Sequence, residues 1–187
     1  MAFEQALVVI DLQRDYFPGG NFPLPDIERT VGQAARLIDL FRRNRLPVVH
    51  VRHLEKDPAV GFLMEGTPGS EIDDRVRPEG QDLLITKHWP NAFRDTTLSK
   101  ILHVLGSHKL VFCGAMTNMC VDATVRAAFD AGYVCAIVAD ACAASDLEFE
   151  GSTIPAATVH GAFLAALASA YGEVTTVEAL AARFEAA

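Results

Sequence analysis

The feature of this sequence that most constrains its fold is a repeated alternation of short, continuously apolar runs with helical segments. Strands that are buried on both faces form such unbroken apolar runs, and they need helices on both sides of the sheet. The expected strands cover residues 6–10, 47–51, 82–86, 109–113, 133–139 and 173–177. The expected helices cover residues 27–41, 97–105, a segment from residue 120, residues 155–170 and the C-terminal end. This pattern predicts an α/β fold, a three-layer α/β/α sandwich around a six-stranded parallel sheet.

Composition restricts the class of protein and of partner. A chain of 187 residues, half of them hydrophobic, is expected to form one ordered domain, residues 1–187. No apolar run approaches the roughly 20 residues of a membrane span. The first residues lack a secretory signal pattern, so we expect a cytoplasmic protein without a membrane partner. Sixteen basic against 24 acidic residues, a net charge of −8, argue against nucleic acid as a partner.

The cysteines show no metal-binding spacing. Cys113, Cys120, Cys135 and Cys142 contain no C-x-x-C pair, and two of them fall in expected strands. Reduced thiols fit this arrangement better than disulfides.

Cys120 differs from the other cysteines because of the segment around it, residues 109–133. An apolar strand leads through a short turn at Gly114 into a helical stripe. The stripe consists of Val121, Val125, Ala128 and Phe129. A cysteine in the first turn of such a helix lies at the positive end of the helix dipole. Unpaired N–H groups there favour thiolate over thiol and can hold an oxyanion. An isolated cysteine is more often a small core residue, so other residues must decide.

Two further strands end in residues of complementary chemistry. The first expected strand ends at Asp11 and the third at Lys87, while the fourth leads to Cys120. The carboxyl ends of parallel strands share one edge of the sheet, where α/β proteins bind their ligands. A strand-end aspartate is more often a cap and a strand-end lysine is more often solvated. Their joint occurrence with Cys120 favours a catalytic site.

These three side chains permit hydrolysis of an amide without a metal or another cofactor. A thiolate attacks a carbonyl, and a nearby carboxylate takes the thiol proton and returns it to the leaving amine. An ammonium group beside both stabilises the thiolate and keeps the carboxylate ionised. Water then hydrolyses the thioester, with the carboxylate as general base. The substrate of such a site would be a small molecule.

Three motifs in this order resemble the isochorismatase-like cysteine hydrolases, over about residues 6–177. The family's D-x-Q-x-D-F reads D-L-Q-R-D-Y at residues 11–16, with Tyr16 in place of Phe. Its K-x-x-x-S/N-A-F occupies residues 87–93 and its G-x-x-T-x-x-C residues 114–120. The resemblance implies a Rossmann-type strand order, with Cys120 as nucleophile, Asp11 as general base and acid, and Lys87 as their charge partner. It also implies a cis peptide at Ala115-Met116 and an oxyanion hole formed by the Met116 and Cys120 amides.

The positions at which this chain departs from the family's motifs indicate which of the family's reactions it is expected to catalyse. Nicotinamidases of the family bind a metal through Asp-x-His after the second strand, whereas this chain reads H-V-R-H at residues 50–53. No histidine follows between His53 and Lys87, so a metal site is not expected, and His50 is interpreted as a hydrogen-bonded core residue. Isochorismatases protonate a vinyl ether with the aspartate and need no thiol. Retention of Cys120 therefore favours C–N hydrolysis, as in the family's N-carbamoylsarcosine, maleamate and ureidoacrylate amidohydrolases.

The remaining expectations concern substrate contacts and assembly. Residues expected to contact substrate are Gln13, Phe17, Trp89, Asn91 and Thr117, with Met116 and Phe93 as further apolar walls. The long segment 54–81 has little periodicity and several turn formers, which suits a lid or an assembly arm. The family resemblance implies a homodimer or larger homo-oligomer. Three alternatives stay open: a vinyl-ether hydrolase that uses Asp11 alone, a binding or assembly protein without turnover, and a redox role for Cys120.

Overall fold

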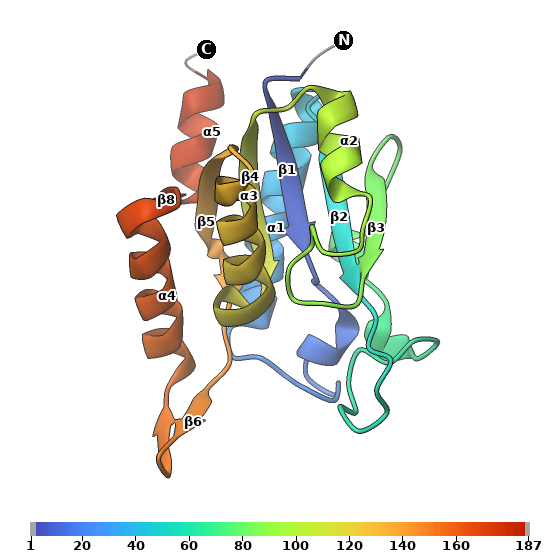
Figure 1. The fold of residues 1–187 in the computed structure, drawn as a ribbon, viewed down its shortest axis with the longest axis vertical. Coiled ribbons are helices and arrows are strands. Elements are labelled where there is room, and N and C mark those ends of the chain that lie inside the picture. The colour runs from blue at the N-terminus through green and yellow to red at the C-terminus, as the bar shows by residue number, and fades with distance from the viewer. Residues whose placement is uncertain (1–2, 186–187) are drawn as a thin grey trace.

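The computed structural model describes residues 3–185 of the chain (Figure 1); the ends of the expected domain lie outside them. Eight strands occur in the order β1 (Gln5–Ile10), β2 (Val48–His53), β3 (Leu83–Lys87), β4 (Lys109–Ala115), β5 (Val134–Ala143), β6 (Leu147–Phe149), β7 (Ser152–Ile154) and β8 (Glu173–Thr175). The α-helices are α1 (Ile27–Arg43), α2 (Leu98–Leu105), α3 (Asp122–Asp130), α4 (Ala156–Ala170) and α5 (Val177–Glu185).

Six strands form one sheet in the order β3-β2-β1-β4-β5-β8, and every neighbouring pair is parallel. This confirms the predicted α/β class and the Rossmann-type order. The order reverses at β1, whose neighbours are β2 and β4. Crevices at the carboxyl ends of the strands beside such a reversal are where these folds bind ligands.

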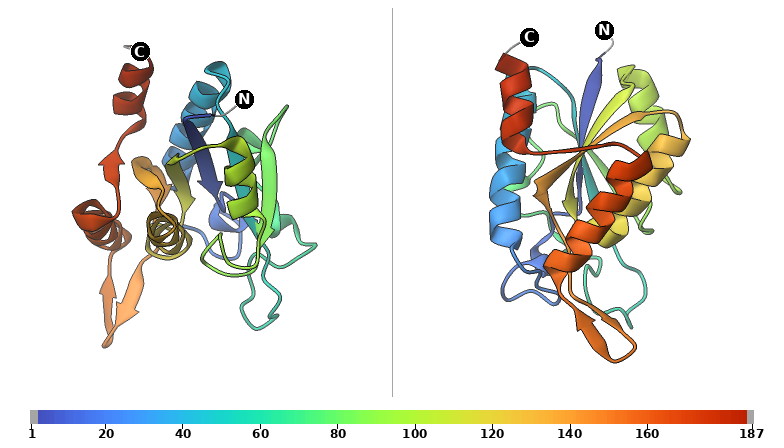
Figure 2. Two further views of the ribbon diagram at one scale, coloured as in Figure 1. Left: turned by 45° about the horizontal axis from the view of Figure 1, so that its top comes forward. Right: turned by 90° about the vertical axis from the view of Figure 1, so that its left-hand side faces the viewer.

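The helices form a layer on each face of the sheet, as the second view in Figure 2 shows. Helices α1 and α5 lie on one face, and α2, α3 and α4 lie on the other. Each helix turns an apolar stripe to the sheet; in α1 the buried stripe includes Val31, Ala34, Ile38 and Phe41. The central strands are buried on both faces, which explains their unbroken apolar runs.

The last third of the chain departs from the sequence-based expectations. Strand β5 runs to Ala143 instead of ending at 139, because a bulge between Phe112 and Gly114 lets it continue to pair with β4. Strand β8 ends at Thr175, and the Asp140 carboxylate accepts a hydrogen bond from the first N–H of α5 at Val177.

A two-stranded hairpin, β6–β7, was not expected from the sequence. It projects at the carboxyl edge of the sheet (Figure 1). Its turn residues, Glu150 and Gly151, both have positive φ, the conformation that two-residue hairpin turns require. Its strands of three residues are too short to show a period.

Most of the segment 54–81 lies at the carboxyl edge of the sheet, below β2 and β3 in Figure 1, and its last residues run back to the start of β3. It contains two short 3₁₀ turns, Pro68–Ser70 and Asp74–Val76. Leu63, Ser70 and Val76 are buried within it, so the segment is packed. Among residues 3–185, none of the helices is long and apolar enough to cross a membrane.

Candidate active site

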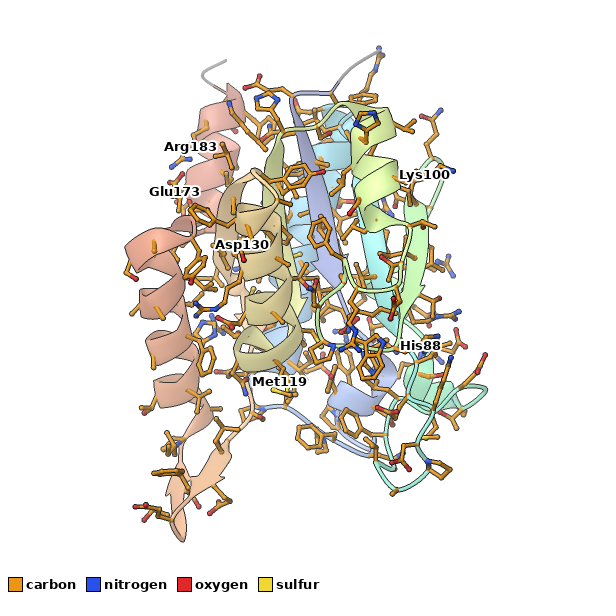
Figure 3. All side chains as sticks on the ribbon, viewed as in Figure 1. His88, Lys100, Met119, Asp130, Glu173 and Arg183 are labelled. Atoms are coloured by element: carbon orange, nitrogen blue, oxygen red, sulfur yellow. The ribbon has the colours of Figure 1, made fainter. Side chains whose placement is uncertain are left out.

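Lys87 is the centre of the site. It is the last residue of β3, and its side chain is fully buried. Its Nζ lies 2.6 Å from Asp11 Oδ2 and 3.2 Å from Cys120 Sγ. The three residues predicted from strand ends therefore meet at one point. In Figure 3 their chain neighbours, the half-buried His88 and the exposed Met119, mark this edge of the sheet.

Asp11 follows β1 with a positive φ of 49°, a conformation that is uncommon outside glycine and is enriched at functional sites. Its side chain is fully buried, and within residues 3–185 neither carboxylate oxygen has a hydrogen-bond partner beyond the Lys87 ion pair. A buried carboxylate with one cationic partner and free lone pairs can accept a proton from a neighbouring group.

Cys120 lies in a five-residue π-helical turn, Thr117–Val121, which precedes α3. The expected helix therefore begins two residues after Cys120, at Asp122. Val121, Val125 and Ala128 are buried as predicted, whereas Phe129 is 45% exposed and packs edge-on against Tyr171 at the rim of the sheet. Single π turns within helices are frequent at functional sites.

Burial of Cys120 opposes the thiolate form that its place at the start of a helix favours. Burial, followed by the nearby Asp11 carboxylate, raises the pKa of Cys120 to about 12, although Lys87 acts to lower it. Burial by itself would lower the pKa of Lys87, but Asp11 and Cys120 outweigh this effect, so the pKa of Lys87 is raised. The resting site therefore holds a thiol and an ammonium group, and the thiol needs a base before it can attack.

Gly114 brings the nucleophile turn close to Asp11. It pairs with Ile10 across the β1–β4 ladder and has φ of 130°. A Cβ atom at this position would lie 1.9 Å from the Ile10 carbonyl oxygen, so only glycine fits. The next residues form a cis peptide bond between Ala115 and Met116.

Gln13 and Asp15 attach the segment 54–81 to the turn that follows β1. The Gln13 Nε2 group donates to the carbonyl oxygens of His53 (2.8 Å) and Ser70 (2.7 Å). The buried Asp15 carboxylate accepts hydrogen bonds from the N–H groups of Leu63 (2.6 Å) and Asn21 (3.1 Å). The D-x-Q-x-D motif thus provides one residue that contacts Lys87 and two that attach this segment.

The polar side chains predicted to contact substrate all bond within the protein. Besides Gln13, the Asn91 Oδ1 atom accepts from the Phe93 N–H at 2.8 Å. The Thr117 hydroxyl lies 2.9 Å from His160 Nδ1 on α4. Direct contact of these groups with a substrate would need a shared or exchanged hydrogen bond, so their assignment stays a prediction.

The aromatic candidates lie near the same edge. Trp89 is 42% exposed, and the Arg94 guanidinium carbon lies 3.7 Å from its ring centroid. Phe17 is nearly buried, with the Arg75 guanidinium over its ring, and it lines a hollow of about 540 Å³ with Asp15 and Gly69. Cys120, Asp11 and Lys87 do not line this hollow. Contact of either ring with substrate likewise stays a prediction.

Sequence reasoning missed two residues at the site. His53 was considered only as part of an absent metal motif, yet its Nδ1 atom lies 2.8 Å from Lys87 Nζ. Tyr16 is buried and packs against the stacked rings of Phe22 and Phe62. Burial, followed by the charges of Cys120 and Asp11, raises the pKa of Tyr16 well above its ordinary value. The signal for Tyr16 was its departure from the Phe of the motif; His53 had no signal beyond its place at a strand end.

Asp11, His53 and Cys120 offer one ligand atom each within 4.8 Å of one another, a spacing that would suit a metal ion. However, all three side chains contact the Lys87 ammonium group: Asp11 Oδ2 at 2.6 Å, His53 Nδ1 at 2.8 Å and Cys120 Sγ at 3.2 Å. A divalent cation bound there would have to displace this positive charge.

Comparison with known proteins identifies the family to which this chain belongs. The isochorismatase domain model matches residues 5–179. The chain belongs to the isochorismatase family. The isochorismatase family protein YddQ of Bacillus subtilis is 45% identical over 174 residues, which cover 93% of this chain and 97% of YddQ. Members of the family are hydrolases, and so is this chain.

Two solved structures of isochorismatase-family proteins show the same fold. A structure from Oleispira antarctica that bears the name isochorismatase hydrolase is 46% identical and superposes with a TM-score of 0.92, covering 97% of this chain and 98% of the other. N-carbamoylsarcosine amidase from Thermoplasma acidophilum is 28% identical with a TM-score of 0.80, covering 94% and 97%. The second is, by its name, an amidase.

Proposed function

We propose that this isochorismatase-family hydrolase is a cysteine-dependent amidohydrolase that cleaves the C–N bond of a small amide, carbamoyl or ureido compound. The observation that carries this proposal is the contact of one buried ammonium group, Lys87 Nζ, with both Asp11 Oδ2 and Cys120 Sγ. The similarity to an N-carbamoylsarcosine amidase supports the same class of substrate.

In acylation, Asp11 takes the Cys120 proton as the sulfur attacks the carbonyl carbon of the substrate. The raised pKa of the resting thiol, about 12, favours attack that is concerted with this proton transfer. The sulfur bonds to the carbonyl carbon, and the main-chain N–H groups of Met116 and Cys120 receive the oxyanion. The intermediate collapses when Asp11 returns the proton to the leaving nitrogen, which leaves as an amine or ammonia and forms a thioester at Cys120.

Deacylation reverses these roles with water. Asp11 takes a proton from the attacking water molecule, whose oxygen bonds to the thioester carbon. The C–S bond then breaks, and Asp11 returns the proton to the Cys120 sulfur. Lys87 remains protonated throughout, because its raised pKa keeps it an ammonium group beside whichever partner carries negative charge. The products are a carboxylic or carbamic acid and the free enzyme.

Trapping by intact mass spectrometry tests the proposal. We expect one member of a panel of small amides, carbamoyl and ureido compounds to give a transient acyl adduct on Cys120 and to release amine or ammonia. Cys120→Ala should abolish both without unfolding the protein. A Cys120→Ala variant with full turnover contradicts the thiol mechanism. If that variant still hydrolyses isochorismate, the chain is a vinyl-ether hydrolase that uses Asp11.

A further inference from the structure

His53 contacts the Lys87 ammonium group beside Asp11 and Cys120, and the proposed mechanism gives it no role. It is the last residue of β2, and the parallel register pairs it directly with Lys87 at the end of β3. Both residues are buried, and His53 Nδ1 lies 2.8 Å from Lys87 Nζ. Paired residues of neighbouring strands project to the same face of the sheet, so their side chains meet.

The number of donors matches the number of acceptors at this point. An ammonium group carries three N–H donors and no acceptor. Lys87 Nζ has three partners within 3.2 Å: Asp11 Oδ2, Cys120 Sγ and His53 Nδ1. Each partner can accept one N–H. Without His53, one N–H of a fully buried ammonium group would lack a partner, and the group could turn away from the sulfur.

This contact determines the state of the His53 ring. A protonated Lys87 cannot accept a hydrogen bond, so His53 Nδ1 must carry a lone pair and the ring proton must be on Nε2. Nε2 lies 3.7 Å from Glu55 Oε2. Burial, then the Lys87 charge, lowers the pKa of His53, which keeps the ring neutral at physiological pH.

The main chain of His53 is held as firmly as its ring. Gln13 Oε1 accepts a hydrogen bond from the His53 N–H at 2.8 Å, and Gln13 Nε2 donates to the His53 carbonyl at 2.8 Å. The Leu54 N–H also donates to the Lys87 carbonyl at 3.0 Å. These bonds join the segment after β1, the end of β2 and the end of β3 around the ammonium group.

We infer that His53 is a positioning residue whose neutral Nδ1 accepts the third N–H of the Lys87 ammonium group and so aims the other two at Asp11 and Cys120. This inference rests on the proposed function for its effect on turnover, but the contact itself can be measured without a substrate. Protonation of His53 would replace the lone pair with a second donor facing Lys87. The charged or titratable groups near the ring are Lys87, Asp11, Glu55 and Cys120.

Long-range ¹⁵N–¹H spectra of ¹⁵N-histidine-labelled enzyme test the contact. The chain has six histidines, and the signal that is missing from the spectrum of His53→Asn is assigned to His53. We expect His53 to show the Nε2–H form at pH 7 and to titrate below its ordinary pKa of about 6.5. In Lys87→Met the titration midpoint should rise, because the opposing charge is gone. A proton on Nδ1 in the wild type, or the same midpoint in Lys87→Met, overturns the inference.

Turnover of the substrate found by trapping tests the consequence. An asparagine carbonyl oxygen can occupy the place of Nδ1 and accept the same N–H, whereas leucine cannot. We expect His53→Leu to lower kcat by about 100-fold with little change in KM, as misplacement of a reacting group does. His53→Asn should recover kcat to within a few-fold and lose one titration from the acid limb of the pH profile.

The spectra and the turnover measurements together distinguish failure of the His53 inference from failure of the proposed function. Equal damage in folded His53→Leu and His53→Asn, or full activity in His53→Leu, contradicts positioning. If no compound in the panel is turned over, the proposed function fails, and the spectra alone still decide whether His53 accepts from Lys87. Circular dichroism and urea unfolding establish that each variant is folded before it is scored.

Discussion

Lys87 Nζ lies 2.6 Å from Asp11 Oδ2, and neither side chain is exposed to solvent. A buried ion pair is costly to desolvate and often contributes little net stability, but removal of one partner leaves an uncompensated charge. A role in catalysis therefore explains the buried Lys87–Asp11 pair better than a contribution to stability does. The pair holds charge beside the Cys120 sulfur, where the proposed reaction develops it.

Lys87→Met should therefore damage both turnover and folding. We expect turnover to fall by at least about 10²- to 10³-fold, because a buried electrostatic partner of the reacting groups is lost. The free energy of unfolding at pH 7, measured with urea, should fall by about 3–5 kcal/mol. Lys100→Met on the exposed face of α2 (Figure 3) is the matched control and should change neither quantity. A Lys87→Met variant that behaves like this control would remove Lys87 from the mechanism.

Alkylation of Cys120 by iodoacetamide should be slow at neutral pH. Only the thiolate reacts, and the pKa of Cys120 is raised to about 12, so the thiol loses its proton only in strongly alkaline solution. We expect the rate at Cys120, followed by peptide mass spectrometry, to rise about tenfold for each pH unit between 7 and 9. Cys120→Ala supplies the background from the other thiols. A rate plateau below pH 8 would show a resting thiolate instead.

Gly69→Ala should loosen the attachment of the segment 54–81. A Cβ atom at Gly69 would lie 2.0 Å from Asp15 Oδ1, the carboxylate that binds the Leu63 N–H. Overpacking of this kind costs about 1–3 kcal/mol of unfolding free energy, and we expect KM to rise more than kcat falls. Gly161→Ala is the control, because a Cβ atom at this position in α4 would meet no atom of a neighbouring element within 4 Å. This variant should raise the free energy of unfolding by up to about 1 kcal/mol. Equal stability of the two variants would contradict the role of Asp15.

Asp82→Asn should lower stability at neutral pH but not in acid. Burial acts to raise the pKa of Asp82, yet hydrogen bonds from His50 and Arg42 outweigh it and lower this pKa to about 2. A carboxyl with a lower pKa in the folded state stabilises the protein above about pH 4, and this stabilisation is lost as the pH falls toward 2. With solvent screening we expect a loss of about 1–2 kcal/mol at pH 7.

Urea unfolding of wild type and Asp82→Asn at pH 7 and pH 3 measures this difference. The difference in unfolding free energy between wild type and Asp82→Asn should be smaller at pH 3 than at pH 7. A gap that stays constant between the two values would show that the charge of Asp82 contributes nothing. His50 is buried as its apolar strand predicted, and its Nε2 atom lies 3.1 Å from Asp82 Oδ2.

The sheet and the meeting of Asp11, Lys87 and Cys120 could be predicted because both depend on local sequence and general rules of topology. Continuous apolar runs indicate parallel strands covered on both faces, and the carboxyl ends of such strands share one edge. The hairpin β6–β7 could not be predicted, because strands of three residues leave no periodic signal. The end of β5 was placed four residues too early, because a bulge depends on the partner strand.

By itself the sequence determined the α/β class, the strand ends that carry the site, and the identity of its three central side chains. Only the tertiary structure decided the ionisation of these side chains and which further residues contact them. A helix-start cysteine suggests a thiolate, but Cys120 is buried beside a carboxylate, and the free energy of desolvating charge exceeds the help of the helix and of Lys87. His53 joins the site through its register with Lys87, which depends on contacts between residues 34 positions apart. Burial and register are properties of the packed chain, and no local pattern of residues contains them.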